Sequence, residues 1–511
     1  MLLLLPFLLL AGLLTPNFML GRKRKAAVRT PSSRGYRGPG GGAWHYMRNP
    51  TFFRSTSNQV AGLYPWLIGS GTPTIGVPIG RVKHKQSKGS VVFCDPISWF
   101  ERAKLISQPS AFILGLPALG KSTLIKHWIL GLDYFGVKSL VLGDLKGEYV
   151  ELISALGGQV IPIGRGRGYL NVLDMGDAPA AAKQLQAAGQ SDAAAHLLAA
   201  AKGRRQIAVE TLLTIHRAAA VNSVESGVIS EGLRILDSRT FRRPVILADL
   251  LRVIQEPTPA MHRMAVSRND LTAYQEITRQ LEADLEQLTA GHGLGEIFSK
   301  ATTTHLVRGQ HAVYDVSSIG DGEKKLQAAA LMLCWEIGFG SIAVSNALAD
   351  AGLEPHQPMH AVLDELWRVL RAGPGLVDRA DGLTRLNRDK GVGVTFASHT
   401  MEDLEALPTK EDISKAVGLL ERCGMVIAFG LPASEMPRLS KAVKLSGIEK
   451  RTLNGWTTPK SWSTRKKSKG KPPPGRGKCL IKVGERRGIS VEIELLEMEK
   501  QFNKTSKRWA A

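Results

Sequence analysis

The residues from Gly115 to Thr123 have types and a spacing that suit phosphate binding. The segment reads Gly115-Leu116-Pro117-Ala118-Leu119-Gly120-Lys121-Ser122, followed by Thr123. It matches the pattern G-x-x-x-x-G-K-[ST] at every defined position, in which glycines let backbone N–H groups surround phosphate oxygens. We predict that residues 115–123 bind ATP, with Lys121 on the β- and γ-phosphates and Ser122 on Mg²⁺.

The chain around this loop provides the context that such a site requires. The apolar residues 111–114 read as a buried strand, and residues 121–130 read as a helix whose positive end faces the loop. A strand, a loop and a helix in this order favour a true phosphate site over a glycine-rich turn that binds nothing.

A second segment supplies the acidic groups that hydrolysis needs. The apolar run Met359–Leu363 reads as a buried strand, and Asp364 and Glu365 follow it directly. In parallel sheets, ligands bind at the carboxyl ends of the strands. We predict that Asp364 holds Mg²⁺ through water and that Glu365 orients or deprotonates the attacking water. The alternative is a solvated pair of acids at a strand end.

Three further residues are candidates for sensing the nucleotide. His399 ends the strand-like run that starts at Val394, at the edge where a γ-phosphate sensor would lie. Its alternative role is to cap the following helix. Arg385 and Arg388 precede the same strand and could reach the nucleotide of a neighbouring subunit, where arginine stabilises transition-state charge. The alternative is that both are ordinary surface arginines.

Strand-like and helix-like segments alternate over much of the chain. The strand-like segments are residues 137–144, 159–163, 311–316, 359–364, 393–397 and 425–429, and helices such as residues 325–337 separate them. Such alternation predicts an α/β fold with a mainly parallel sheet, here a RecA-like P-loop NTPase core. From about residue 179 the chain becomes rich in Ala and Leu, which predicts an all-α insertion domain within that core.

Six parts of the chain are therefore expected. They are a membrane anchor (1–20), a basic Gly/Arg-rich linker (21–69), the first part of the NTPase domain (70–178), the helical insertion (179–300), the second part of the NTPase domain (301–450) and a basic tail (451–511). Within the tail, residues 489–495 are β-like and are expected to dock back on the body of the protein.

Positive charge is concentrated at the two ends of the chain. Of 511 residues, 67 are Lys or Arg and 45 are Asp or Glu, a net charge of +22. Residues 1–60 contribute +9 and residues 451–511 contribute +11, so the middle is nearly neutral. Basic ends favour anionic partners such as DNA or a lipid surface, with a solvated tail as the alternative. The 4 cysteines are scattered and indicate neither a zinc site nor a disulfide framework.

The first 20 residues are Leu-rich and uncharged, and Arg22-Lys23-Arg24-Lys25 follows them. A secretory signal would carry its positive charge before the apolar run. We interpret residues 1–20 as an uncleaved anchor that leaves the body on the cytoplasmic face of the membrane. The alternative is a start codon placed too far upstream, which would leave a cytoplasmic protein.

Beyond the P-loop, several segments carry a resemblance to a known family. They are Gly143–Tyr149 (GDLKGEY), Leu156–Gly158, Asn171–Asp174, Tyr314–Val316, Leu363–Trp367 and Arg388–His399, in that order. With these segments, residues 70–450 resemble the FtsK–HerA-like motor ATPases, and are most similar to the TraC/TrbE-type ATPases of conjugative type IV secretion systems in actinobacteria. The resemblance implies a Mg²⁺-dependent ATPase that forms a homo-oligomer, typically a hexameric ring with ATP between subunits, and that works with other secretion components.

The chain departs from this family in two ways. About a hundred residues precede the P-loop, where the family usually has a long N-terminal docking domain, and His399 stands where the family usually has Gln. The leading hypothesis is an ATPase that powers transfer of DNA or protein. The alternatives are a TraG-type coupling protein that moves DNA directly, and a scaffold whose assembly is switched by nucleotide.

Overall fold

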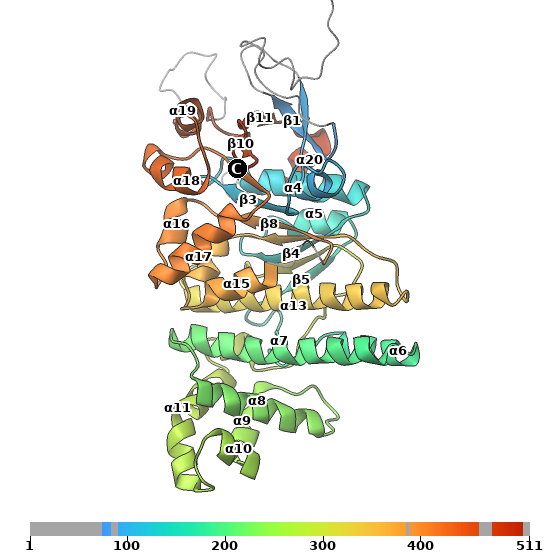
Figure 1. Ribbon diagram of the computed structural model, residues 1–511, viewed down its shortest axis with the longest axis vertical. Helices are drawn as coiled ribbons and strands as arrows, with labels where there is room; N and C mark the ends of the chain where they lie inside the picture. The colour runs from blue at the N-terminus through green and yellow to red at the C-terminus, as the bar shows by residue number, and fades with distance from the viewer. Residues whose placement is uncertain (1–73, 83–89, 385–387, 389, 459–472, 504–511) are drawn as a thin grey trace, which may run out of the picture. The chain divides into compact units, whose positions relative to one another are not determined.

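The fold is described from a computed structural model of the protein, in residues 74–82, 90–384, 388, 390–458 and 473–503. Within these residues, eleven strands form one sheet, and helices cover its faces (Figure 1). The fold is α/β, as predicted from the alternation of strand-like and helix-like segments. The predicted anchor (1–20), the linker (21–69) and Arg385 lie outside the described residues.

The sheet has a parallel part and an antiparallel part. In chain order the strands are β1 (Pro78–Val82), β2 (Val91–Phe93), β3 (Ser110–Leu114), β4 (Lys138–Asp144), β5 (Gln159–Pro162), β6 (Ala312–Asp315), β7 (Met359–Leu363), β8 (Val392–Ala397), β9 (Met425–Ala428), β10 (Lys478–Lys482) and β11 (Ile489–Ile493). Across the sheet their order is β2-β1-β11-β10-β9-β3-β8-β7-β4-β6-β5. All neighbours from β9 to β5 are parallel, and those from β2 to β9 are antiparallel.

The parallel strands are apolar along their whole length because both faces of the sheet are covered. Every residue of β3, β7 and β8 is buried. On one face lie α3 (Pro96–Glu101), α4 (Lys121–Tyr134) and α5 (Val150–Ala155), whose apolar side chains share one core cluster with that face. Because the strands are parallel, their carboxyl ends lie at the same edge of the sheet, and predicted site residues follow β3, β7 and β8 there.

The other face carries α13 (Lys324–Asp350), which begins where sequence analysis expects a helix and continues well beyond it. A Cβ atom on Gly338 would lie 2.3 Å from Leu142 Cδ2, so a larger residue would force the Leu142 side chain to move where α13 approaches β4. Among the described residues, α13 is long and apolar enough to cross a membrane, but 72% of its most apolar stretch is buried inside the protein. We therefore regard it as a core helix.

The segment between β5 and β6 is largely helical, and Figure 1 shows α7 with α6 along α13 and α8–α11 further from the sheet. Its helices are α6 (Ala178–Ala187), α7 (Ser191–Arg217), α8 (Ser223–Ser238), α9 (Leu247–Gln255), α10 (Pro259–Met264), α11 (Leu271–Thr289) and α12 (Gly295–Phe298). A capping box of Asn222 and Glu225 starts α8. Arg217 pairs with Glu225 and with Asp284, which ties α7 to α8 and α11.

Short helices follow β7 and pack near β8 and β9. They are α14 (Leu366–Leu370), α15 (Leu376–Thr384), α16 (Met401–Glu405), α17 (Lys410–Glu421), a 3₁₀ turn (Ala433–Glu435), α18 (Met436–Ala442) and α19 (Gly447–Gly455).

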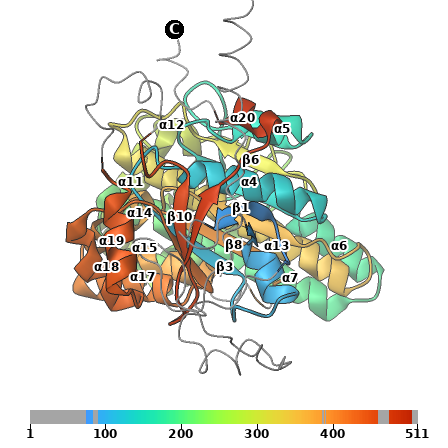
Figure 2. The same cartoon turned by 90° about the horizontal axis from the view of Figure 1, so that it is seen from above.

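Residues within the predicted basic tail are part of the sheet. Strands β10 and β11 form a hairpin between β9 and β1, so a segment from the end of the chain links the parallel strands to the N-terminal pair. After β11, helix α20 (Glu497–Phe502) lies against α4: His127 Nδ1 is 2.6 Å from Glu499 Oε1, and Lys126 Nζ donates to the Phe502 carbonyl at 2.8 Å (Figure 2). The docking expected for residues 489–495 thus occurs as a strand.

Candidate functional site

The loop between β3 and α4 has the backbone shape of a phosphate cradle. Ala118 and Gly120 have φ angles of 62° and 118°, and Gly120 precedes the first residue of α4. These left-handed conformations turn successive backbone N–H groups toward one side of the loop. Since glycine adopts positive φ at little cost, Gly120 suits the point where the loop enters the helix.

Neighbouring strands hold this loop from both sides. The Gly115 N–H donates to the His399 carbonyl at 2.9 Å, and the Leu116 N–H donates to the Gly430 carbonyl at 3.1 Å. The Gly477 N–H donates to the Leu119 carbonyl at 2.8 Å. The loop is therefore fixed to the residues after β8 and β9 and to the turn before β10.

Lys121 lies inside the loop that it is predicted to serve. Its Nζ donates to the Gly115 carbonyl at 2.6 Å and lies 2.9 Å from His399 Nδ1. Burial lowers the pKa of Lys121 to about 8, although the nearby carboxylates of Asp364 and Glu365 favour the charged form. Ser122 and Thr123 occupy the first turn of α4 and are half-buried.

Glu365 follows β7 and is bound by side chains from three elements. Its Oε1 accepts from Lys146 Nζ at 2.6 Å, and its Oε2 accepts from Trp367 Nε1 at 2.7 Å. His399 Nε2 lies 3.2 Å from the same Oε2. Because the Lys121 ammonium can only donate, Nδ1 of this ring is the acceptor, and Nε2 is the nitrogen that can donate to Glu365. His399 therefore connects the P-loop lysine to the catalytic candidate.

The backbone at Glu365 is strained. Its φ is 53°, in the left-handed region that few non-glycine residues adopt, and it immediately precedes α14. Such strain concentrates at functional sites, where the surrounding structure holds it. Here the surrounding structure is the set of three side chains that bind the Glu365 carboxylate.

Asp364 has a different environment from its neighbour. Its Oδ2 accepts from the Tyr149 hydroxyl at 2.9 Å, and its Oδ1 accepts from the Glu365 N–H at 2.9 Å. Burial, and then the adjacent Glu365 carboxylate, raise the pKa of Asp364. Burial alone would also raise the pKa of Glu365, but the hydrogen bond from His399 and the charge and hydrogen bond of Lys146 lower it overall. The two neighbouring carboxyl groups therefore differ in acidity, and Glu365 is the one that ionises more readily.

The loop after β4 completes the site. Asp144 accepts backbone N–H bonds from Lys146 at 3.1 Å, from Glu148 at 3.0 Å and from Tyr149 at 2.7 Å. One buried carboxylate thus fixes the loop that presents Lys146 to Glu365 and Tyr149 to Asp364. Two buried polar atoms in this region, Glu148 Oε2 and Ser398 Oγ, have no hydrogen-bond partner in the protein, a condition that often accompanies a binding or catalytic role.

The structure brings together most of the predicted site residues. Those that meet at the carboxyl ends of β3, β7 and β8 are Gly115–Thr123, Asp364, Glu365 and His399. Arg388 lies at the opposite end, just before β8, where its guanidinium is 5.7 Å from the centre of the Phe100 ring. Arg388 therefore does not join the site of its own chain, and its predicted contact with a neighbouring subunit stays a prediction.

No sequence pattern assigns a role to Lys146, Tyr149 or Trp367, although all three lie in the segments that carry the family resemblance. A lysine or an aromatic residue near a strand end is too common to indicate a contact. Only the tertiary structure shows that all three bind the Asp364–Glu365 pair. The signal available in the sequence was their position directly after β4 and β7.

The side-chain oxygen atoms at this site suit Mg²⁺ better than a metal ion that is bound by protein side chains alone. Within the described residues, no group of three or more His, Cys, Asp or Glu side chains is arranged to hold a metal ion. Ser122 and Asp364 offer oxygen atoms only, at the sheet edge that faces the P-loop. Mg²⁺ usually takes one or two such protein ligands and completes its shell with phosphates and water.

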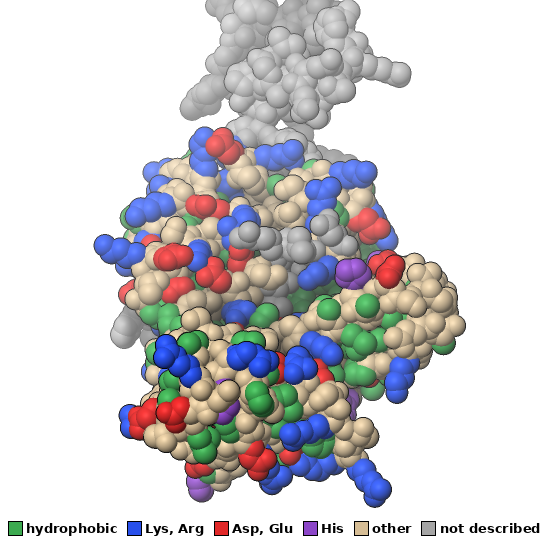
Figure 3. All heavy atoms as spheres, turned by 60° about the horizontal axis from the view of Figure 1, so that its bottom comes forward, with side chains coloured by type: hydrophobic (Ala, Val, Ile, Leu, Met, Phe, Trp, Pro, Cys, Tyr) green, Lys and Arg blue, Asp and Glu red, His purple; other side chains and the backbone are tan. Residues whose placement is uncertain are grey.

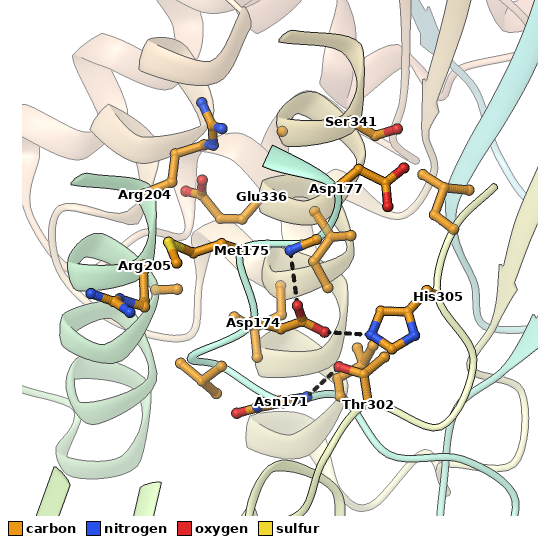
Figure 4. A pocket seen from close by; sticks show the side chains of 18 of the residues that line it. Asn171, Asp174, Met175, Asp177, Arg204, Arg205, Thr302, His305, Glu336 and Ser341 are labelled. Atoms are coloured by element: carbon orange, nitrogen blue, oxygen red, sulfur yellow. Dashed lines mark hydrogen bonds and ion pairs between the residues drawn. The ribbon is translucent and has the colours of Figure 1, made fainter. Parts of the chain in front are cut away.

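A separate pocket lies between α7, α13 and the loops around Asp174 and His305 (Figure 4). Asp174 Oδ2 is 2.9 Å from His305 Nε2 at its rim, and Glu336 lines its wall beside Arg204. Burial raises the pKa of Glu336 to about 7. None of the P-loop residues lines this pocket, so it is distinct from the predicted nucleotide site.

Solved structures show what this fold is similar to. VirB4 of Thermoanaerobacter pseudethanolicus matches with a TM-score of 0.58 and 16% sequence identity, over 84% of this chain and 100% of that chain. The plasmid coupling protein TrwB, in complex with a non-hydrolysable ATP analogue, matches with a TM-score of 0.44 and 11% identity over 84% and 96%. The cytoplasmic domain of the type VII secretion ATPase EccC of Thermomonospora curvata gives 0.30 and 14% over 84% and 30%.

No protein-family model and no curated protein matches the chain. The likeness to the VirB4 structure confirms the predicted fold class, a RecA-like P-loop core with a mainly parallel sheet and helical regions.

Proposed function

We propose that this protein is a Mg²⁺-dependent ATPase that serves as the motor of a conjugation or type IV secretion-like system. One observation carries the enzymatic part: His399 joins the P-loop residue Lys121 to Glu365 at the carboxyl edge of the sheet. Phosphate-binding and water-activating groups thus share one site. The likeness in fold to VirB4 and the family-like segments support the secretion setting.

The geometry supports separate roles in hydrolysis for the phosphate-binding, metal-binding and water-activating residues. The backbone N–H groups of residues 118–121 and the Lys121 ammonium bind the phosphates, and Ser122 and Asp364 would hold Mg²⁺, which neutralises phosphate charge. Glu365 orients a water molecule for attack on the γ-phosphorus and accepts its proton as the bond to the β-phosphate oxygen breaks. His399 lies between Lys121 and Glu365 and senses whether the γ-phosphate is present.

We further propose that the protein works as a homo-oligomer, a hexameric ring, on the cytoplasmic face of the membrane with other secretion components. Residues 1–20 would anchor it, and Arg385 and Arg388 would reach the nucleotide of a neighbouring subunit. The resemblance of residues 70–450 to ring-forming ATPases supports this assembly.

A TraG-type coupling protein that moves DNA directly is the second candidate. The excess positive charge in residues 1–60 and 451–511 favours it, since basic segments bind the DNA backbone. Figure 3 shows acidic side chains interspersed with basic ones on the described surface that it displays, so the ends are the natural DNA contacts. Because β10 and β11 are part of the sheet, the test should neutralise the basic side chains of residues 465–471 rather than delete the tail. Salt-sensitive DNA binding that weakens with this change would favour the coupling protein.

The direct test of the enzymatic proposal compares two lysines at opposite ends of the same sheet. We expect purified full-length protein to release phosphate from Mg-ATP, and Lys121→Ala to reduce the rate by at least about 100-fold. Lys138→Ala removes a matched ammonium that binds Asp133 at the other edge and should leave the rate within about twofold. Equal rates for the wild type and Lys121→Ala would refute the proposal.

A further inference from the structure

The Lys146 side chain binds the catalytic candidate yet remains free to move. Its Nζ donates to Glu365 Oε1 at 2.6 Å, while about half of its side chain (51%) is exposed. Its backbone, in contrast, is fixed by the buried carboxylate of Asp144. A flexible four-carbon stem on a fixed backbone lets the ammonium exchange partners without any movement of the loop.

The two lysines of the site point at the same region. Lys121 and Lys146 lie close enough for their like charges to oppose each other, and both are attracted to Asp364 and Glu365. Lys121 reaches this region from the P-loop and Lys146 reaches it from the loop after β4. A phosphate group that enters between them would be attracted by both ammonium groups.

The contact between Lys146 and Glu365 conflicts with the proposed reaction. Oε1 of Glu365 accepts from Lys146, and Oε2 accepts from Trp367 and His399, so both oxygens have strong donors. A water molecule that is to be oriented for attack needs one of these oxygens as its acceptor. Lys146 is the donor best able to leave, since its side chain is half exposed, whereas Trp367 lies in the first turn of α14 and His399 also contacts Lys121.

We propose that Lys146 is a nucleotide-responsive latch: it holds Glu365 Oε1 when the site lacks a γ-phosphate, and it moves to the γ-phosphate when ATP binds, which frees Oε1 for the attacking water. This inference rests on the proposed ATPase function. Lys146 acts on the reaction through Glu365 and is in that respect a positioning residue. It also gives the site a means to distinguish ATP from ADP, because ADP has no group that draws Lys146 away.

The test measures affinity for two nucleotides that differ in the γ-phosphate. In full-length protein with Mg²⁺, we expect Lys146→Met to weaken binding of the analogue AMP-PNP by about tenfold, since a charge-assisted hydrogen bond is lost. Binding of ADP should change by less than about twofold. Lys146→Arg keeps the charge and should retain most of the AMP-PNP affinity. Lys138→Met, which removes a lysine from the opposite edge, serves as the matched control.

A double-mutant cycle with Glu365→Gln tests the latch itself. The neutral amide that this substitution introduces holds Lys146 less strongly, so Glu365→Gln should tighten AMP-PNP binding in a chain that retains Lys146. The same change should have no effect when Lys146→Met is already present. Equal shifts for AMP-PNP and ADP in Lys146→Met, or additive effects in the cycle, would overturn the latch.

The latch and the ATPase proposal fail in different ways. If the wild type neither binds nor hydrolyses Mg-ATP, the ATPase proposal itself is wrong. If the wild type hydrolyses ATP but Lys146→Met does not discriminate between AMP-PNP and ADP, only the latch is wrong.

Discussion

Two polar networks lie at opposite ends of the parallel strands, and they differ in charge. At the carboxyl ends, Lys121, Lys146, Asp364 and Glu365 gather four ionisable groups around His399. Near the amino ends, a chain of hydrogen bonds links histidine, serine and threonine and ends at the ion pair of Asp133 and Lys138. The two networks occupy the same sheet, so their contrast compares a proposed catalytic site with a network that serves stability.

In the network near the amino ends, the polar side chains bind one another. His360 Nε2 lies 2.8 Å from Thr395 Oγ1, and His360 Nδ1 lies 3.4 Å from Ser139 Oγ. His311 accepts from the Ser139 N–H at 3.0 Å and reaches Asp133 at 2.8 Å. Burial lowers the pKa of His360 to about 3 and also lowers that of His311, so both rings are neutral near pH 7.

The network at the carboxyl ends instead places like charges together. Two carboxyl groups are adjacent in sequence and two ammonium groups converge on them, next to unpartnered buried atoms of Glu148 and Ser398. Folding alone would favour fewer charges here, because burial of each charge is costly. The arrangement makes sense if a charged ligand completes it, and the predictions below test this contrast.

The largest effect is expected at Asp364, the carboxylate proposed to hold Mg²⁺. We expect Asp364→Asn to lower Mg²⁺-dependent ATP hydrolysis by at least about 100-fold, because the metal loses its anionic protein ligand. Asp133→Asn, the matched change in the amino-end network, should leave the turnover per folded molecule within about twofold. Phosphate release at saturating Mg-ATP measures both. A strong loss of turnover in Asp133→Asn alone would reverse the roles that we assign to the two networks.

A smaller effect is expected at His399. His399→Ala should lower kcat by about tenfold or more, since Glu365 loses a donor and Lys121 loses an acceptor. His399→Gln should retain most of the activity, because an amide can both donate to Glu365 and accept from Lys121. Steady-state kinetics of the two variants separate a role in the network from a role as a helix cap. Equal activity in His399→Ala and the wild type would exclude His399 from the site.

A change in the amino-end network should affect stability alone. Thr395→Val keeps the shape of the side chain but leaves His360 Nε2 without its buried partner. We expect the free energy of unfolding to fall by about 1–3 kcal/mol, with the kcat for ATP unchanged. Denaturant unfolding and phosphate release on the same preparation measure the two quantities. A change in kcat that exceeds the loss of folded protein would contradict the assignment.

The smallest effect is the pH dependence that the neutral histidines create. Because the pKa of His360 is lower in the folded protein than the ordinary value, the unfolded chain binds its proton first as the pH falls. The stabilising contribution of neutral His360 is therefore complete above about pH 6.5 and is lost as the pH falls from there toward 3. His360→Gln should show a shallower loss of stability between pH 6.5 and 5. An unchanged slope would indicate that other groups, such as His311, dominate.

Local sequence patterns predicted the elements of the catalytic edge but not the contacts across it. The P-loop pattern and the acids after Met359–Leu363 each follow from a strand end, and the parallel sheet places them at one edge. Lys146 could not be assigned because its partner is 219 residues away, and hydrophobic periodicity carries no information about such pairs. The place of β10 beside β9 was missed for a similar reason, since a short strand does not specify its neighbour.

Glu365→Gln tests the central claim most directly, because it removes the charge of the proposed base and leaves the size of its side chain unchanged. The measurements are phosphate release and ATP binding by the full-length protein with Mg²⁺, with Glu354→Gln as a control from an ion pair outside both networks. We predict that Glu365→Gln still binds ATP but turns it over at least about 100-fold more slowly, while Glu354→Gln behaves as the wild type. Wild-type turnover in Glu365→Gln would contradict the account.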